Sequence, residues 1–130
     1  MKIPENANVI DWPTSILWFD EDGILCAISK KVPEQTLEEA KESMLDFERL
    51  TGGKKVCMLI DITNSSPTSK EMRDYSAAEL PKITKALAMI STSALGKMIA
   101  NLFFGLKPPP YPTKMFSNEK DAKEWLKQYL

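Results

Sequence analysis

The stretch VCMLIDITNSSPTSKEMRDY, residues 56–75, decides the fold. It opens with a nearly continuous apolar run, Val56 to Ile62, which is typical of a central strand covered on both faces. A loop rich in hydroxyl groups follows, and the charged segment from about Ser69 to Leu80 is helix-like. Because a buried strand that leads into a helix is the repeating unit of α/β proteins, the stretch predicts that class.

Further strands and helices alternate on both sides of this unit. The β-rich runs 15–20 and 24–30 are joined by an Asp-Gly turn signal, which predicts an antiparallel hairpin. A helix then begins after Thr36, which forms a capping box with Glu39, and it ends at the glycine pair 52–53. The other predicted elements are the strand 83–91, a helix at 94–105, an edge strand at 113–116 and a last helix capped by Ser117.

The order of these elements predicts an α/β fold with an N-terminal β-hairpin followed by alternating βα units. We expect a mostly parallel central sheet flanked by about four helices. At 130 residues the chain is expected to form a single domain, 1–130. In this scheme residues 1–13 are an N-terminal extension. The segment KPPPYP, 107–112, is a loop, because its four prolines lack N–H donors.

The composition argues against several classes of function. Without histidine the chain has no Ser-His-Asp or Cys-His catalytic set, and it lacks both glycine-rich motifs that cradle phosphates. The spacing of Cys26 and Cys57 fits no metal motif. A net charge of −1 argues against nucleic-acid binding.

The location follows from two further absences in the sequence. No window reaches the roughly 18 apolar residues of a membrane span. The start MKIPENANVIDW lacks the apolar core of a signal peptide. We therefore expect a cytoplasmic protein with no cofactor, no metal, no nucleic-acid partner and no stable membrane insertion.

The hydroxyl-rich loop is the first candidate site. Its residues are Asp61, Ser65, Ser66, Thr68 and Ser69. A phosphate on a serine here would meet the free N–H groups and the favourable dipole of a helix start, which would make this a phosphoacceptor or interaction loop. The alternative is that Ser66 or Thr68 is simply the N-cap, and we favour it because these are preferred cap residues. Asp61 could likewise face a ligand at the end of a parallel strand, but we favour a carboxylate that accepts hydrogen bonds from loop N–H groups.

The third predicted helix is the second candidate site. Its apolar residues cover more than one face, which indicates either burial on several sides or a surface for an apolar ligand or a partner. These residues are Leu95, Met98, Ile99, Leu102, Phe103 and Phe104. Core packing is the alternative, and we favour it slightly.

Three segments, MLIDITNSSPTSKEMRDY, ALAMISTSALGKMIANLFF and KMFSNEKDAKEWL, resemble the STAS domains and their SpoIIAA-like relatives. These relatives are small bacterial proteins related to anti-sigma factor antagonists. The resemblance covers residues 15–130 and includes a strand ending in an LxD pattern at Asp61, and a last strand ending at Phe116 before a polar cap and a helix. It implies a STAS-like fold and a regulatory role, with a phosphorylated serine that would fall near Ser65 and Ser66.

Two hypotheses of function follow from these features. The first is a non-enzymatic regulatory or protein-interaction module of STAS-like type, acting through residues 61–69 and the helix that follows, with a homodimer as the expected assembly. The alternative is a protein that binds or carries a small hydrophobic, lipid-like ligand in a pocket lined by the helix 94–105. An enzyme is a distant third, because no spacing of carboxylates, lysines or tyrosines points to catalysis.

Overall fold

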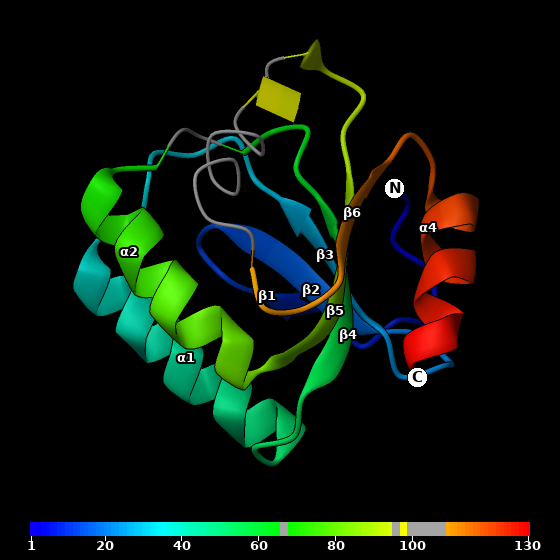
Figure 1. Ribbon diagram of the computed structural model, residues 1–130, viewed down its shortest axis with the longest axis horizontal. Coiled ribbons are helices and arrows are strands. Elements are labelled where there is room, and N and C mark those ends of the chain that lie inside the picture. Colours follow the sequence, from blue (N-terminus) through cyan, green and yellow to red (C-terminus); the bar gives the residue numbers. More distant parts are fainter. Residues whose placement is uncertain (66–67, 95–96, 99–108) are drawn as a thin grey trace.

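The computed structural model describes residues 1–65, 68–94, 97–98 and 109–130. In these residues it contains a six-stranded mixed sheet and three α-helices (Figure 1). The strands are β1 (Ile10–Asp11), β2 (Ser15–Phe19), β3 (Leu25–Ser29), β4 (Val56–Asp61), β5 (Thr84–Ile90) and β6 (Thr113–Phe116). The α-helices are α1 (Leu37–Thr51), α2 (Lys70–Glu79) and α4 (Glu119–Leu126), and short 3-10 turns follow α2 at Leu80–Lys82 and α4 at Lys127–Tyr129.

The strands lie in the sheet in the same order as in the sequence. β1, β2 and β3 pair antiparallel, and β3, β4, β5 and β6 pair parallel. The predicted hairpin and the mostly parallel sheet are therefore confirmed. β1 was not predicted: this two-residue strand lies in the segment assigned to an N-terminal extension, and it pairs Ile10 with Leu17 and Asp11 with Ile16.

Helices cover both faces of the sheet. α1 and α2 lie side by side on one face, and α4 covers the other (Figure 1). The alternation of side chains along β4 matches this arrangement, since Met58 packs in the core under α1 and α2 whereas Cys57 and Leu59 pack in the core under α4. The prediction that the run 56–62 is a strand covered on both faces is confirmed.

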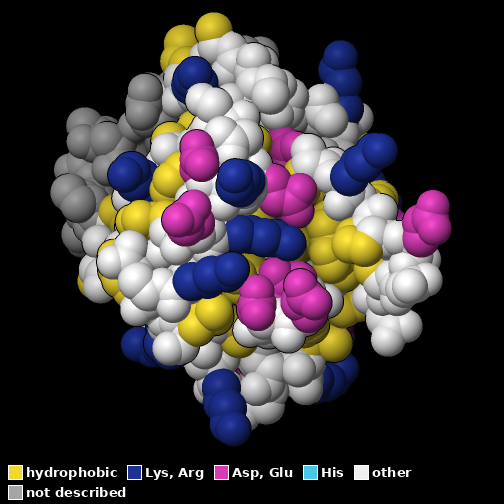
Figure 2. All heavy atoms as spheres, turned by 90° about the vertical axis from the view of Figure 1, so that its right-hand side faces the viewer, with side chains coloured by type: hydrophobic (Ala, Val, Ile, Leu, Met, Phe, Trp, Pro, Cys, Tyr) yellow, Lys and Arg dark blue, Asp and Glu magenta, His cyan; other side chains and the backbone are white. Residues whose placement is uncertain are grey.

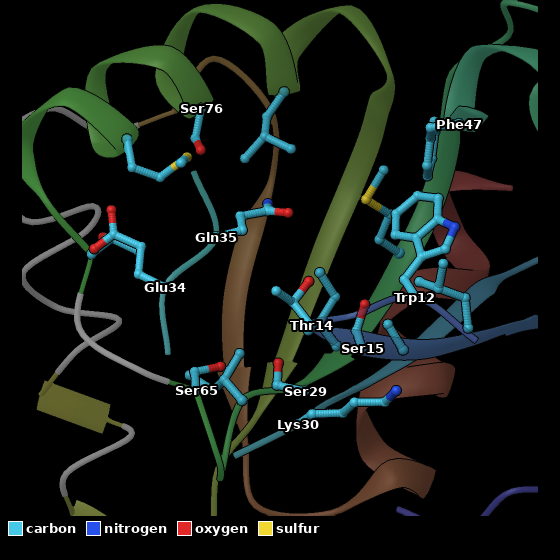
Figure 3. Close-up of a pocket in the computed structure, with 18 of the residues that line it drawn as sticks. Trp12, Thr14, Ser15, Ser29, Lys30, Glu34, Gln35, Phe47, Ser65 and Ser76 are labelled. Carbon is cyan, nitrogen blue, oxygen red and sulfur yellow. The ribbon is translucent and has the colours of Figure 1, made fainter. Parts of the chain in front are cut away.

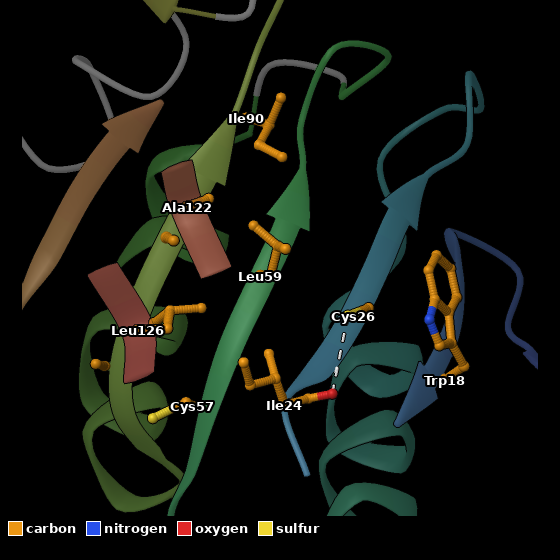
Figure 4. Close-up of a cluster of buried hydrophobic side chains, with 10 residues drawn as sticks. Trp18, Ile24, Cys26, Cys57, Leu59, Ile90, Ala122 and Leu126 are labelled. Atoms are coloured by element: carbon orange, nitrogen blue, oxygen red, sulfur yellow. Dashed lines mark hydrogen bonds between the residues drawn. The ribbon is translucent and has the colours of Figure 1, made fainter. Parts of the chain in front are cut away.

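The core under α4 contains ten buried residues (Figure 4). α4 places Ala122 and Leu126, both fully buried, against a sheet face that includes the small residues Ala86 and Ala88. Small side chains let a helix approach a sheet closely, and each large apolar side chain buried there contributes roughly 1.5–3 kcal/mol. Above this core the surface carries both signs of charge intermixed (Figure 2).

The helix starts confirm one predicted cap and correct two. Thr36 and Glu39 form the expected capping box at α1. At α2 the N-cap is Ser69 rather than Thr68, because the Ser69 hydroxyl accepts the Met72 N–H at 3.2 Å. At α4 the N-cap is Asn118 rather than Ser117, since the Asn118 side chain accepts an N–H three residues on. The true caps stand one residue after Thr68 and Ser117, and Ser69 is three residues after the alternative cap position Ser66.

The predicted set of about four helices is confirmed in part. Three of the four lie in the described part of the chain, at nearly the predicted bounds. Most of the helix at 94–105 lies outside the described residues. Near its start, the Lys97 N–H donates to the Ser93 carbonyl at 3.2 Å, which is the hydrogen bond of one helical turn.

Candidate functional site

A pocket of about 380 Å³ lies between the sheet and the helices α1 and α2 (Figure 3). Most of its wall is apolar and comes from the sheet face, the two helices and the loops that join them. The apolar lining residues are Trp12, Leu17, Leu25, Ala27, Val32, Pro33, Met44, Phe47, Met58, Ile60, Ile62, Met72, Leu80, Ile83, Leu87 and Met89. The polar lining residues are Thr14, Ser15, Ser29, Lys30, Glu34, Gln35, Ser65, Thr68 and Ser76.

The strand period of two explains how the sheet supplies its part of the wall. Every second residue of β2 and β3 points to the same face, so Ser15 and Leu17 line the pocket from β2, and Leu25, Ala27 and Ser29 line it from β3. The hairpin register places Ser15 opposite Ser29 and Leu17 opposite Ala27. One end of this wall therefore carries hydroxyl groups, and the next pair along the strands is apolar.

The pocket exists because α1 and α2 bury few side chains against the sheet. α1 has 15 residues but buries only Ala40 and Phe47, and α2 has 10 residues but buries only Met72. Met44 of α1 lines the cavity while it is only half-buried. Protein interiors are normally packed as densely as organic crystals, so a space of this size under two helices is a candidate binding site.

Methionine is prominent in the wall. Met44, Met58, Met72 and Met89 contribute to it from two helices and two strands. A methionine side chain is unbranched, has three rotatable bonds and carries a polarizable sulfur, so it adapts to the shape of what it touches. This wall can therefore adjust to ligands of different outline.

Both charged side chains among the described lining residues already have partners. The Lys30 ammonium forms an ion pair with the Asp11 carboxylate. The Glu34 carboxylate accepts the Ser69 backbone N–H at 2.9 Å and the Ser69 hydroxyl at 2.7 Å. This second contact joins the loop between β3 and α1 to the start of α2, next to the polar side of the pocket.

Asp61 ends β4 and holds the loop that follows. Its carboxylate accepts the Thr63 N–H at 3.0 Å and lies 3.0 Å from the Met1 ammonium. The Thr63 hydroxyl in turn accepts the N–H of Thr92 at 3.4 Å, which links this loop to the residues after β5. Burial alone would raise the pKa of Asp61, but the hydrogen bonds from Thr63 and the ammonium outweigh it and hold that pKa below its ordinary value.

The structure separates the residues of the predicted loop site. Asp61 has the structural role that we favoured, and it does not line the pocket. Ser65 and Thr68 line the pocket, and Ser69 is exposed and caps α2. Ser66 lies outside the described residues.

Of the residues predicted to form an apolar surface on the third helix, the structure describes only Met98. Met98 is 53% exposed. Leu95, Ile99, Leu102, Phe103 and Phe104 lie outside the described residues, so the prediction that they line a pocket stays a prediction.

Sequence reasoning missed most of the pocket that the structure contains. It assigned no site role to Trp12, Ser15, Ser29 or Met44, all of which line it. A signal was present, because serines occupy the positions of both hairpin strands that otherwise face an apolar core. Ser15 stands two residues before Leu17, and Ser29 stands two residues after Ala27.

Comparison with known proteins gives a family. Residues 17–130 match the family described as a domain of unknown function (DUF7793). The chain belongs to this family. A crystal structure of a protein with unknown function from Arthrobacter sp. FB24 is 28% identical and covers 85% of this chain and 97% of its own. Its TM-score is 0.32, which carries no structural argument, and no curated protein matches the chain.

The described part of this DUF7793 chain contains neither a cluster of metal-binding side chains nor a helix that could span a membrane. Residues 1–65, 68–94, 97–98 and 109–130 contain no group of three or more cysteine, aspartate or glutamate side chains able to hold a metal ion. Among the same residues, no helix has the length and apolar character needed to cross a membrane.

Proposed function

We propose that the protein binds a small, mostly apolar molecule in the pocket under α1 and α2, and that it acts by binding rather than by catalysis. The observation that carries this proposal is an apolar cavity of about 380 Å³ between two helices and the sheet they cover. Pockets that hold small molecules have volumes of roughly 300–1,000 Å³, are mostly apolar and contain a few polar groups that orient the ligand. This pocket has all three properties.

The composition of the wall supports a ligand better than a docked helix or strand. The described wall is formed by side chains from several strands, both helices and the connecting loops, so an occupant would contact several elements at once. Four methionines give it an adaptable surface, which suits a flexible or bulky apolar body. Filling the space would also remove apolar surface from water at about 25 cal/mol per Å².

The regulatory module implied by the resemblance to STAS domains stays a prediction, as do the STAS-like identity of the fold, the homodimer and the cytoplasmic location. The contacts of Ser69 support a structural role for its hydroxyl, which caps α2 and donates to Glu34. A phosphate there would lie beside the Glu34 carboxylate, and like charges at that distance repel.

The test uses two neighbouring positions on α1 that differ in where they point. Met44 lines the pocket, whereas Leu45 is 55% exposed and is absent from its wall. Met44→Trp places a larger side chain in the cavity, and Leu45→Trp makes a similar change on the surface. The probe is Nile red, a neutral apolar dye whose emission shifts to the blue in an apolar site.

We expect one Nile red to bind per chain, Met44→Trp to weaken binding at least about tenfold, and Leu45→Trp to leave it unchanged. Circular dichroism checks that both variants fold. Absence of dye binding to the wild type, or equal effects of the two substitutions, would overturn the proposal.

A further inference from the structure

The charges of the pocket restrict the ligand that it can hold. Lys30 and Glu34 are the charged side chains among its described lining residues, and each is engaged, Lys30 by Asp11 and Glu34 by two groups of Ser69. A charged ligand group would therefore meet no opposite charge among these residues that is still without a partner. Burying an unpaired charge is far more costly than burying a neutral hydrogen-bonding group.

The pocket also contains neutral hydroxyl groups that form no hydrogen bond with another described residue. Ser15 and Ser29 are half-buried, and their hydroxyls have no hydrogen-bond partner in the part of the chain that the structure describes. They are directly opposite each other on β2 and β3, on the face that lines the cavity. Side chains opposed in this way have Cβ atoms about 4.5–5.5 Å apart, so one ligand oxygen between them can bond to both. Figure 3 shows the two residues at the same end of the pocket.

The next pair along the hairpin fixes the direction of the ligand. Leu17 lies opposite Ala27, and both line the pocket beside the serine pair. Farther from the serines, Phe47 of α1 closes the wall in Figure 3. Along β2 and β3 the lining side chains therefore change from hydroxyl groups at Ser15 and Ser29 to the apolar pair Leu17 and Ala27.

We infer that the ligand is an uncharged amphipathic molecule, with an alcohol or carbonyl group held between Ser15 and Ser29 and an apolar chain or ring system lying over Leu17 and Ala27. A hydroxyl both donates and accepts, so the serine pair accommodates either oxygen group. This ligand class rests on the proposed function, because it assigns the contents of the same pocket. Fatty acids and alkyl amines of equal length are excluded as the preferred ligands.

The experiment compares three ligands that share a ten-carbon chain: decanol, decanoate and decylamine. Each displaces Nile red from the wild-type protein at neutral pH, below the concentration at which it aggregates. We expect decanol to bind at least about tenfold more tightly than either charged ligand.

The serine pair is tested with the double variant Ser15→Ala/Ser29→Ala. It should bind decanol about threefold to tenfold more weakly, with the Kd of Nile red determined separately for each variant, because the carbonyl of the dye can also reach the serine pair. The double variant Ser15→Thr/Ser29→Thr keeps both hydroxyls and should restore decanol binding. Ser117→Ala is the matched control, because Ser117 is exposed and is absent from the described pocket wall.

The outcomes separate this inference from the proposed function. If Nile red fails to bind the wild type, both are wrong. If Nile red binds but decanoate or decylamine competes as well as decanol, the neutral ligand class is wrong and the binding function stands. If decanol is preferred but binds the alanine double variant as tightly as the wild type, the assignment to the serine pair is wrong.

Discussion

Replacing Asp61 tests whether the carboxylate at the end of β4 is a structural anchor. Asp61 is 9% exposed, accepts the Thr63 N–H at 3.0 Å and lies 3.0 Å from the Met1 ammonium. Asp61→Asn keeps one carbonyl oxygen and the shape of the side chain but removes the negative charge. Hydrogen bonds to charged groups contribute about 1.5–3 kcal/mol each, and asparagine retains part of one, so we expect a loss of about 2 kcal/mol at pH 7.

The pH dependence gives the same experiment a second readout. Because hydrogen bonds and the ammonium hold the pKa of Asp61 below its ordinary value, its contribution to stability is complete above the ordinary value of about 3.9. The contribution is lost as the pH falls through the lowered pKa of the folded state. The difference between wild type and Asp61→Asn should therefore shrink as the pH is lowered toward about 2.

Urea denaturation followed by circular dichroism between neutral and acidic pH measures both effects. Asp74→Asn is the control, because the Asp74 carboxylate is 69% exposed and pairs only with the exposed Lys70 at 3.6 Å among the described residues. Such a surface pair contributes less than about 0.5 kcal/mol. A loss at pH 7 no larger than that of the control, or a difference that does not change with pH, would refute the anchoring role of Asp61.

Two further predictions concern the other core and the link beside the pocket. Burial raises the pKa of the Cys26 thiol to about 12 and also raises the pKa of Cys57. Neither thiol should therefore react with a disulfide reagent at pH 8 until the protein is unfolded in urea. Rapid labelling of the folded protein would contradict this prediction. Glu34→Ala removes both hydrogen bonds to Ser69 and should lower the free energy of unfolding by about 0.5–1 kcal/mol. The control Glu42→Ala, at an exposed position of α1, should have almost no effect. Equal urea midpoints for the two variants would show that the contact between Glu34 and Ser69 contributes nothing to stability.

The strands and helices could be predicted from the sequence wherever one local pattern determines the structure. The hairpin follows from two β-rich runs and a turn in which Asp20 accepts two backbone N–H groups and Gly23 has a φ of +81°. The start of α1 follows from Thr36 and Glu39, whose reciprocal hydrogen bonds form within four residues. Such interactions need no distant partner, so the local sequence contains the information.

The cap of α2 depends on a partner that is distant in the sequence. The first strand is too short to leave a pattern. Thr68 and Ser69 are both good cap residues, but Ser69 is also held by Glu34, which is 35 residues away. β1 is only Ile10–Asp11, and it exists because β2 offers a free edge beside it. Neither effect leaves a periodic pattern in the sequence.

The pocket could be predicted least of all, because it reflects how closely a helix layer approaches a sheet. Most strand positions that line it are apolar, as in an ordinary core. The sequence around Met44 has the pattern of an ordinary amphipathic helix. Among the strand positions that line it, only Ser15 and Ser29 depart from the apolar pattern. The pair becomes visible only with the register of β2 against β3, which places Ser15 opposite Ser29.

The two faces of the sheet are packed against their helices differently, and the contrast supports the proposed binding site. Under α4, small residues on both sides allow close contact, and a helix of eight residues buries two side chains completely. Under α1 and α2, two longer helices bury three side chains and leave a cavity of about 380 Å³. A ligand in this pocket would add dispersion contacts that the two helices do not make with the sheet. In the proposed complex it would also supply an oxygen for Ser15 and Ser29, and the four methionines of the wall could adapt to its shape.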